Sequence, residues 1–573
     1  MAGIVKGDVS TIECDVLVAG GGVAAASATV HALEQGARVC LAVKGRLGTV
    51  GQRGAGASCC GSTFSGIPRI PGPFREGPYD PDEQFRKVIA AGIGMADRRL
   101  ARALVDGAES MGEAVKSWGV VWQKKGPVAL GYPIVSNLEA RLRSREVRLL
   151  ENTMIVDLLK HDGACVGAVG VQATGEAVVI RCPSVVLATG GDAELFRYNV
   201  HPSCVTGDGY AMALRAGASL MNLEFMQIFF TTVHPTRNLV HLWKGNELGE
   251  IANAEGRRFL SDYLPDGITV KECVEENLRH APFSTRDRAS RYLGIAIVKE
   301  IQAGRGTEHG GVLLKLPEEY DPQDREQNDF FRFKGIEHTA GPVEITMGHQ
   351  CSNGGLKIGT DAMSTVPGLF AAGEATTGMH GADRLGGNML ANCLIFGSIA
   401  GRSAARWADT STVPSAREIR SIAGGSIQEI SALSTKRGKT SVEELRRELQ
   451  ISGWNNGLAV RSEKSLKQML NDLDAIKASI PASLIVDDAD DLIGALELRN
   501  LLLVGEAVAR AALQRRESRG GHYREDFPQQ DKGVSPEVIV IDRKDGGSLS
   551  LHGEVLDPEW AEEDSELGKG RWG

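Results

Sequence analysis

The stretch from residue 13 to residue 43 constrains the fold of this chain more than any other. The segment ECDVLV is typical of a buried strand, three glycines follow at 20–22, SATVHALEQ has helical spacing, and ARVCLAV is a second apolar strand that ends at Val43. Strand, glycine turn, helix and strand in this order predict a βαβ dinucleotide-binding unit. We therefore expect an α/β fold whose first domain is Rossmann-like.

The glycine turn predicts how such a unit would hold its ligand. Gly20 makes the turn, Gly22 lets the backbone approach a pyrophosphate at the helix N-terminus, and Ala25 is the third small residue of the GxGxx(G/A) pattern. An acid often closes the second strand and binds a ribose hydroxyl, but Val43-Lys44 stands there. Lys44 or the backbone is the predicted ribose contact. An ordinary tight turn in an α/β unit is the alternative.

Two later segments also run from an apolar strand into small residues. SVVLATGG, at 184–191, is followed by VTGDGYAMALRAGA, where Asp208 opens a predicted helix. An acid is favoured at a helix start and can also accept a hydrogen bond from a cofactor hydroxyl. PGLFAAGE repeats the pattern and ends in Glu374. The predicted cofactor contacts in these segments are Ala188, Thr189, Gly190, Asp208 and Glu374.

Length and charge exclude several classes of protein. At 573 residues, the chain suggests roughly three or four domains. A net charge of −9 without a basic stripe argues against a nucleic-acid partner. The ten cysteines contain no CxxC pair, which argues against a disulfide framework or an iron–sulfur site on this chain. With no signal peptide and no apolar run of about 18 residues, we expect a cytoplasmic protein that meets a membrane only through a partner.

Seven motifs, in order, resemble the flavoprotein family of fumarate reductase, succinate dehydrogenase and L-aspartate oxidase, with adenylylsulfate reductase as a more distant relative. Between residues 15 and 528 they are DVLVAGGGVAAA, VVLATGG, VTGDGYAMALRAGA, STRDRASR, VPGLFAAGE, HGADRLGGNML and RRESRGGHYREDFP. The resemblance implies a Rossmann-like FAD-binding domain, an inserted α+β capping domain and a C-terminal helical domain. The expected ranges are 10–230 and 349–408 for the FAD-binding domain, 231–348 for the cap, 415–528 for the helical domain and 529–573 for a polar tail with short edge strands.

The resemblance assigns roles to two arginines. Arg384 in HGADRLGG matches the arginine of the family's HGANRLGG, which binds a substrate carboxylate, and arginine suits that role because its fork binds carboxylates bidentately. Arg286 in STRDRAS matches the family's RDxxS arginine, which delivers a proton. Because a guanidinium is a very weak acid, this role needs Asp287 and a relay. The alternatives are charge neutralisation and an ordinary ion pair. The same resemblance adds two cofactor contacts, Asn388 and Leu390.

Two departures from the family pattern concern the substrate. In place of the family's HYTMGG, the chain has GHQCSNGG, so Gln350 takes the position of the histidine and His349 lies one residue earlier; either could reach the carboxylate. The family's EFxQFHPT is stretched to EFMQIFFTTVHPT, which leaves His234 as a candidate that the insertion can displace. The Thr-Glu relay expected about a dozen residues later is replaced by Trp243-Lys244. A different substrate could be accommodated here.

The linkage of the flavin can also be predicted. Several relatives attach FAD through a histidine near the second strand, but this chain has no histidine between His31 and His161. We therefore expect non-covalent FAD. The region instead reads GQRGAGASCCG, where Gly54 and Gly56 would let the backbone lie against the flavin and Cys59-Cys60 are small buried thiols or, alternatively, redox-active ones.

These observations predict an FAD-dependent oxidoreductase. It would move a hydride between flavin N5 and a carbon–carbon bond next to a carboxylate, and exchange electrons with a separate iron–sulfur subunit. The alternatives are an amino-acid oxidase of the L-aspartate oxidase type and a flavin relay subunit without its own substrate. No metal site is predicted.

Overall fold

The computed structural model describes residues 9–47, 80–117, 139–237, 246–280, 282–315, 341–531 and 536–556. Several residues of the sequence predictions lie outside this part of the chain: Gly54, Gly56, Cys59, Cys60, Trp243 and Lys244.

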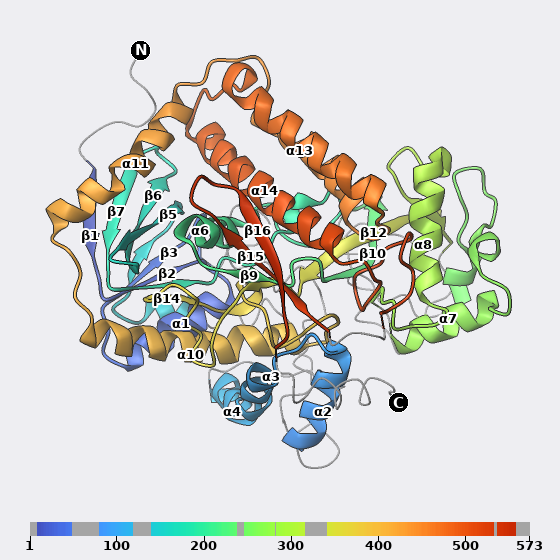
Figure 1. Cartoon of the computed structure of the whole chain (residues 1–573), viewed down its shortest axis with the longest axis horizontal. Coiled ribbons are helices and arrows are strands. Elements are labelled where there is room, and N and C mark those ends of the chain that lie inside the picture. Colours follow the sequence, from blue (N-terminus) through green and yellow to red (C-terminus); the bar gives the residue numbers. More distant parts are fainter. Residues whose placement is uncertain are drawn as a thin grey trace.

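A five-stranded parallel sheet lies in the left part of the molecule as seen in Figure 1. Its strand order is β14-β8-β2-β3-β4. Every residue of the inner strands is buried, as expected for parallel strands that are covered on both faces. The strands are β2 (Val16–Ala19), β3 (Val39–Ala42), β4 (Arg148–Leu150), β8 (Ser184–Leu187) and β14 (Leu369–Ala371).

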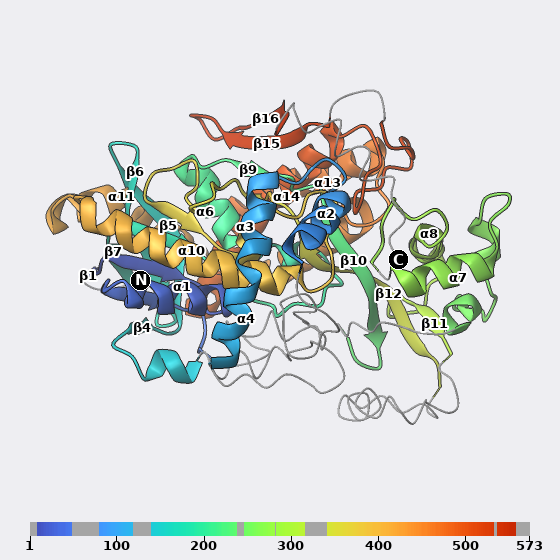
Figure 2. The same ribbon diagram turned by 90° about the horizontal axis from the view of Figure 1, so that it is seen from below.

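Two helices cover one face of this sheet. Helix α1 (Val23–Glu34) joins β2 to β3, and α10 (Asn388–Thr410) packs along it. The approach is close because a side chain at Gly401 would place its Cβ 2.2 Å from the carbonyl oxygen of Ala28. Figure 2 shows α10 beside α1, with α3 (Arg98–Asp106) and α4 (Ala108–Ser117) crossing α10; α2 (Pro81–Gly92) packs on α3.

A second sheet lies next to the first and has the order β1-β7-β6-β5. Its strands are β1 (Ser10–Glu13), β5 (Thr153–His161), β6 (Ala164–Gln172) and β7 (Ala177–Arg181). The segment ECDVLV, predicted as one strand, is therefore divided at residues 14–15. Its first residue, Glu13, pairs with β7, and the part from Val16 onward belongs to the parallel sheet.

The insertion contains an antiparallel sheet of order β10-β12-β11 and two helices at the right of Figure 1. These elements are β10 (Met226–His234), β11 (Val312–Leu314), β12 (Val343–Ser352), α7 (Val270–Arg279) and α8 (Arg291–Glu300). Strands β10 and β12 run across the expected boundaries at 230/231 and 348/349. The insertion is therefore joined to the FAD-binding part by two continuous hydrogen-bonded strands.

The C-terminal part is helical from 416 to 514. It consists of α11 (Ala416–Ser434), α12 (Val442–Ser452), α13 (Glu463–Ser483) and α14 (Ala489–Gln514). Serine capping boxes start α11 and α12, and the aspartate Asp488 caps α14. Helix α14 packs on α6 (Asp208–Ala216), which brings its middle to the nucleotide end of the FAD-binding part.

The two strands of the tail, both expected at a sheet edge, differ in their position within the sheet. They form β15 (Val538–Arg543) and β16 (Leu549–Glu554) in a sheet of order β13-β9-β15-β16, with β9 (Leu220–Met221) and β13 (Gly355–Leu356). Of these two strands, only β16 lies at an edge of the sheet. Strand β15 is an inner strand, and its first four residues, VIVI, are buried. None of the helices in the described ranges is long and apolar enough to cross a membrane.

Candidate active site

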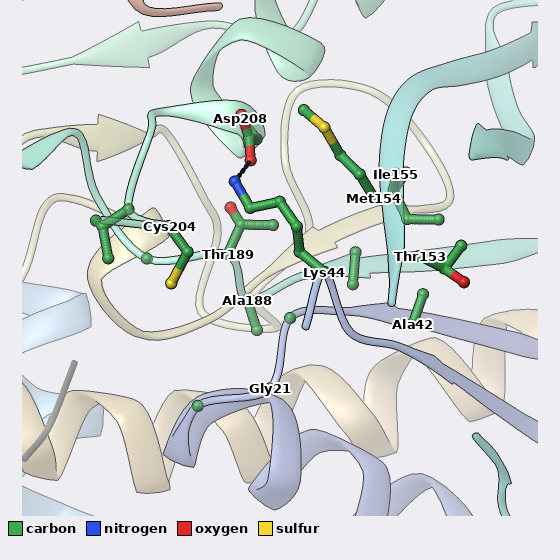
Figure 3. Close-up of a pocket in the computed structure, with 15 residues that line it drawn as sticks. Gly21, Ala42, Lys44, Thr153, Met154, Ile155, Ala188, Thr189, Cys204 and Asp208 are labelled. Carbon is green, nitrogen blue, oxygen red and sulfur yellow. Dashed lines mark hydrogen bonds and ion pairs between the residues drawn. The ribbon is translucent and has the colours of Figure 1, made fainter. Parts of the chain in front are cut away.

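A pocket lies at the glycine turn, where the parallel strands end. It is lined by predicted contacts from three segments: Gly20, Gly22, Lys44, Ala188, Thr189, Gly190 and Asp208. Figure 3 shows Gly21 below the pocket and the Lys44 side chain reaching across it to Asp208. Ala25 is fully buried in the first turn of α1. This position, beyond the carboxyl ends of parallel strands, is where α/β sheets bind ligands.

The backbone at the turn needs glycine and offers donors. Gly20 has φ +131°, and a Cβ there would lie 2.2 Å from the carbonyl oxygen of Ala188. Helix α1 starts after Gly22 without a capping side chain and without an acid in its first turn. Its first N–H groups can therefore bind an anionic group such as a pyrophosphate.

Lys44 is held by a buried ion-pair network. Its Nζ lies 2.7 Å from Asp208 Oδ2, 2.8 Å from Glu497 Oε1 and 2.8 Å from Thr206 Oγ1. Burial lowers the pKa of Lys44, but the charges of Asp208 and Glu497 raise it by more, so the net shift is upward. The ammonium is therefore charged and fixed at the pocket wall.

Sequence reasoning missed two residues of α14 in this network. Glu497 pairs with Lys44 and with Arg446, and Asn500 Nδ2 donates to Asp208 Oδ1 at 2.8 Å. Both are essentially inaccessible to solvent. The signal was present, because Glu497 and Asn500 are polar residues three apart in the run LIGALELRNLLLVG, where Arg499 is the only other polar residue.

The other predicted cofactor contacts continue the site along α1 toward the start of α10. Glu374 is buried, and its Oε1 accepts a hydrogen bond from the backbone N–H of Ser352 at 3.0 Å. The preceding Gly373 lies against Ala24 of α1, because a Cβ there would be 2.7 Å from the Ala24 Cβ. Asn388 and Leu390 are buried in the first turn of α10, which also begins without a capping side chain. Two uncapped helix starts therefore lie along one path.

This path fits a dinucleotide cofactor such as FAD. The hydroxyl oxygen of Thr189 lines the pocket and is buried without a hydrogen-bond partner within the described ranges. Both polar atoms of the Asn353 side chain are also buried without a hydrogen-bond partner within the described ranges. Buried polar groups are nearly always paired in native proteins, so these atoms fit a polar ligand. The flavin-side residues Gly54 and Gly56 lie outside the described residues.

Arg384 lies in the loop just before α10, and its guanidinium contacts two side-chain amides. Its Nη2 donates to Gln227 Oε1 and, at 3.2 Å, to Gln350 Oε1. Its Nη1 donates to the carbonyl of Leu385, and its Nε is buried without a partner among the described residues. In the described part of the chain, no carboxylate pairs with the Arg384 guanidinium. Its positive charge and its forked N–H groups are therefore suited to binding a carboxylate ligand.

Arg286 contacts Asp383, the residue that precedes Arg384. Arg286 Nη2 is 3.7 Å from Asp383 Oδ2, and the Ser284 hydroxyl donates to the same oxygen at 2.8 Å. The other carboxylate oxygen accepts from the Arg384 backbone N–H at 2.9 Å. Arg286 Nη1 is buried and has no partner in the described part of the chain. Gln227 joins this group to Arg384, because its Nε2 donates to Asp383 Oδ1 at 3.4 Å and its Oε1 accepts from Arg384 Nη2. Two arginines from distant segments thus belong to one hydrogen-bonded cluster, and each has an unused N–H.

The structure separates the two alternatives on β12. Gln350 is the extra residue of a β-bulge in the pairing of β12 with β10, and its side chain contacts Arg384, whereas His349 points to the opposite side. The His349 ring stacks on Phe196, and its Nε2 lies 3.0 Å from Ser352 Oγ. Burial, with the charges of His201 and Arg461, holds the pKa of His349 well below its usual range. His349 is thus a neutral core histidine and does not meet Arg384.

His234 is also not brought to Arg384. It lies seven positions after Gln227 along β10, a distance of roughly 23 Å at the usual rise of a strand. His234 stacks on His309, with ring centroids 4.2 Å apart, and His309 Nδ1 lies 2.9 Å from Glu344 Oε1. The displacement has a simple cause: the extra residues of EFMQIFFTTVHPT lengthen β10 and carry the histidine to its far end.

Replacing Gly20 with alanine should abolish FAD retention. The Cβ would overlap the Ala188 carbonyl, and the backbone conformation alone costs about 1–3 kcal/mol for a residue with a side chain. Gly424→Ala in α11 is the matched control, because no atom lies within 4 Å of its Cβ and alanine favours a helix. The FAD-to-protein ratio after purification checks this, and a Gly20→Ala protein with full FAD would contradict the proposed fit.

The sequence and the fold are similar to those of known proteins. The sequence matches the FAD binding domain family over residues 15–132 and 125–390, and the fumarate reductase flavoprotein C-term family over 446–558. It is 32% identical to one subunit of the fumarate reductase (CoM/CoB) of Methanothermobacter marburgensis, across 93% of this chain and 97% of the relative. It is 27% identical to L-aspartate oxidase of Streptomyces coelicolor, across 94% and 93%. The solved structure of Mycobacterium smegmatis Sdh1 in complex with UQ1 superimposes with a TM-score of 0.81 at 26% identity, covering 98% of each chain.

Proposed function

This chain belongs to the fumarate reductase flavoprotein family of FAD-dependent oxidoreductases, and we propose that it reduces or forms a carbon–carbon double bond next to a carboxylate. One observation carries the proposal: Arg286 pairs with Asp383, Gln227 contacts both Asp383 and the Arg384 guanidinium, and each arginine has a buried N–H that has no partner among the described residues. A carboxylate substrate would supply the acceptors that these groups lack.

Each side chain then has a role. Arg384 pins the substrate carboxylate, and the amide oxygens of Gln227 and Gln350 fix the orientation of its guanidinium. Bound FAD supplies or takes up a hydride at the adjacent carbon. Arg286 donates or removes the proton at the other carbon, and Asp383 holds the Arg286 guanidinium in position.

We further propose that the electrons are exchanged with a separate iron–sulfur subunit. None of the cysteines in the described ranges forms a disulfide, and the sequence contains no CxxC pair. The Methanothermobacter relative is itself named as one subunit of its fumarate reductase. A partner chain would supply the clusters that this chain does not encode.

A turnover assay tests the proposed function. The FAD-loaded protein is mixed anaerobically with reduced methyl viologen and a panel of unsaturated mono- and dicarboxylates. We expect one of them to accelerate viologen oxidation. If no carboxylate does so, but an amino acid drives rapid oxygen consumption, the protein is instead an oxidase of the L-aspartate oxidase type.

Replacing Gln350 with histidine should change the substrate preference. The substitution restores the histidine of HYTMGG and replaces a neutral amide next to Arg384 with a group that can be charged. We expect kcat/KM for dicarboxylates relative to monocarboxylates to change by about tenfold. His349→Gln, on the other side of β12, is the matched control and should leave the ratio unchanged. An unchanged ratio in Gln350→His would contradict the placement of Gln350 at the substrate.

A further inference from the structure

His280 lies between two carboxylates beside Arg286. It follows the last residue of α7; its Nδ1 is 2.6 Å from Asp287 Oδ2, and its Nε2 is 3.6 Å from Asp383 Oδ2. Both ring nitrogens therefore face carboxylate oxygens. Only the protonated imidazolium has a donor for each of them.

The two carboxylates are themselves held in place. The Ser290 hydroxyl donates to Asp287 at 3.1 Å, and the Ser284 hydroxyl donates to Asp383 at 2.8 Å. Exposure falls along this group, because the His280 side chain is 21% exposed and the Asp383 side chain is 2% exposed. The imidazole thus connects solvent to a buried carboxylate.

The charges around His280 favour its protonated form. Burial lowers its pKa, but the hydrogen bond to Asp287 and the charges of Asp383 and Asp287 raise it by more, against a smaller lowering by Arg286, and the pKa ends above its usual range. The end of α7 adds to this, because a helix C-terminus favours positive charge. The carboxylate of Glu276, one turn earlier, accepts hydrogen bonds from the backbone N–H groups of residues 289 and 290.

One oxygen of Asp383 is shared between His280 and Arg286. Asp383 Oδ2 lies 3.6 Å from His280 Nε2 and 3.7 Å from Arg286 Nη2. Both separations are within ion-pair range, so a small side-chain rotation or one water molecule completes the connection. Asp383 is also where HGADRLGG departs from the family's HGANRLGG, so the carboxylate is a feature of this chain.

We propose that His280 returns a proton from solvent to Arg286 through Asp383 after each reduction of the substrate. This inference rests on the proposed function, in which Arg286 is the proton donor. His280 touches no substrate, and it acts as a positioning and relay residue.

Protons and electrons balance in each cycle. Arg286 gives its proton to one substrate carbon, and FAD, when bound in its reduced form, would supply the hydride to the other. The proton on His280 Nε2 passes to Asp383 Oδ2, and the carboxyl proton passes to the neutral Arg286, which restores the guanidinium and the carboxylate. The imidazole ring then turns its unprotonated Nε2 away from Asp383 to solvent, takes up a proton there and returns to Asp383. One solvent proton is consumed for each substrate reduced.

His280→Gln tests the relay, because glutamine can still donate a hydrogen bond but cannot pass a proton. In the wild type, kcat should fall as pH rises through the pKa of His280, since the imidazolium is lost. In His280→Gln, kcat should be about 10²-fold lower, lack this dependence and recover in part with added imidazole, while KM stays within about twofold. His309→Gln is the matched control, because His309 also pairs with a carboxylate, Glu344, but belongs to the His234 stack.

Asp383→Asn removes the shared carboxylate and should give a similar loss. The double variant should be no slower than either single variant, because both interrupt one path. A readout independent of turnover is the histidine side-chain 15N spectrum of the FAD-loaded protein without substrate. The His280 signal, identified by its loss in His280→Gln, should be that of an imidazolium at neutral pH and should titrate at lower pH in Asp287→Asn.

The outcomes separate the two levels of the proposal. If the wild type reduces no unsaturated carboxylate, the proposed function fails and the relay fails with it. If the wild type turns over and His280→Gln keeps its kcat and pH profile, the relay alone is overturned. A neutral His280 at neutral pH would overturn it as well.

Discussion

Replacing Arg286 with alanine should lower kcat for an unsaturated carboxylate by about 10³-fold and leave FAD bound. Arg286 holds a buried, unpartnered Nη1 within the described part of the chain, and Asp383 keeps the guanidinium in place. A positioned proton donor contributes about 10²–10⁴-fold to rate. KM should change little, because Arg384 still binds the carboxylate.

The matched control is Arg288→Ala, two residues along the same loop. Arg288 is exposed and donates to the carbonyl of Gly267 at 3.3 Å. It should keep the wild-type kcat. If Arg286→Ala also kept it while electrons still passed through the flavin, the protein would be a relay subunit, with Arg286 as a structural residue.

Replacing Arg384 with alanine should lower kcat/KM by about 10³-fold, chiefly by raising KM. The change removes the cation that pins the carboxylate, and truncating one side of a buried charge pair costs about 2–5 kcal/mol. It also leaves the amide oxygens of Gln227 and Gln350 without their donor. Steady-state kinetics with the best substrate of the panel measures the effect.

Two further variants sharpen this result. Arg384→Lys keeps the charge but loses the bidentate fork, so its kcat/KM should lie between those of the wild type and the alanine variant. Arg406→Ala, at an exposed position of α10, should behave as the wild type. Equal loss in Arg384→Lys and Arg406→Ala would show that the effect comes from the stability of α10 and not from the substrate.

Local patterns were sufficient to predict the βαβ unit and its glycine turn, but not the contribution of α14 to the Lys44 network. The βαβ unit is present as expected because a glycine turn between two wholly apolar strands has few other solutions, and Gly20 adopts a φ that requires glycine. The division of ECDVLV between two sheets could not be predicted. Both halves are compatible with a strand, and only the pairing of β7 with β1 decides where the chain changes sheets.

The substrate end was less predictable because it depends on register. A motif count could not choose between His349 and Gln350, since a shift of one residue turns a side chain to the other face of a strand. The structure supplies that register through the pairing of β12 with β10. The position of β15 as an inner strand was hidden for a similar reason, because its partner β9 comes from a distant segment.

The residues that the sequence did not identify as a group are those that meet only in three dimensions. His280 and Asp383 are about a hundred positions apart, and Lys44 meets Glu497 from the opposite end of the chain. Each is an unremarkable polar residue in its own segment. Their importance depends on burial and on the charge of their neighbours, which no local pattern contains.

The most direct test of the proposed chemistry is a single anaerobic turnover. The FAD of the purified chain is reduced, excess reductant is removed, and the protein is mixed with fumarate and with other unsaturated carboxylates while the absorbance of oxidised flavin is recorded. We predict rapid recovery of the oxidised band with one of these compounds and very slow recovery in Arg286→Ala. Recovery with no carboxylate, but with an iron–sulfur partner or with oxygen, would contradict the proposed function.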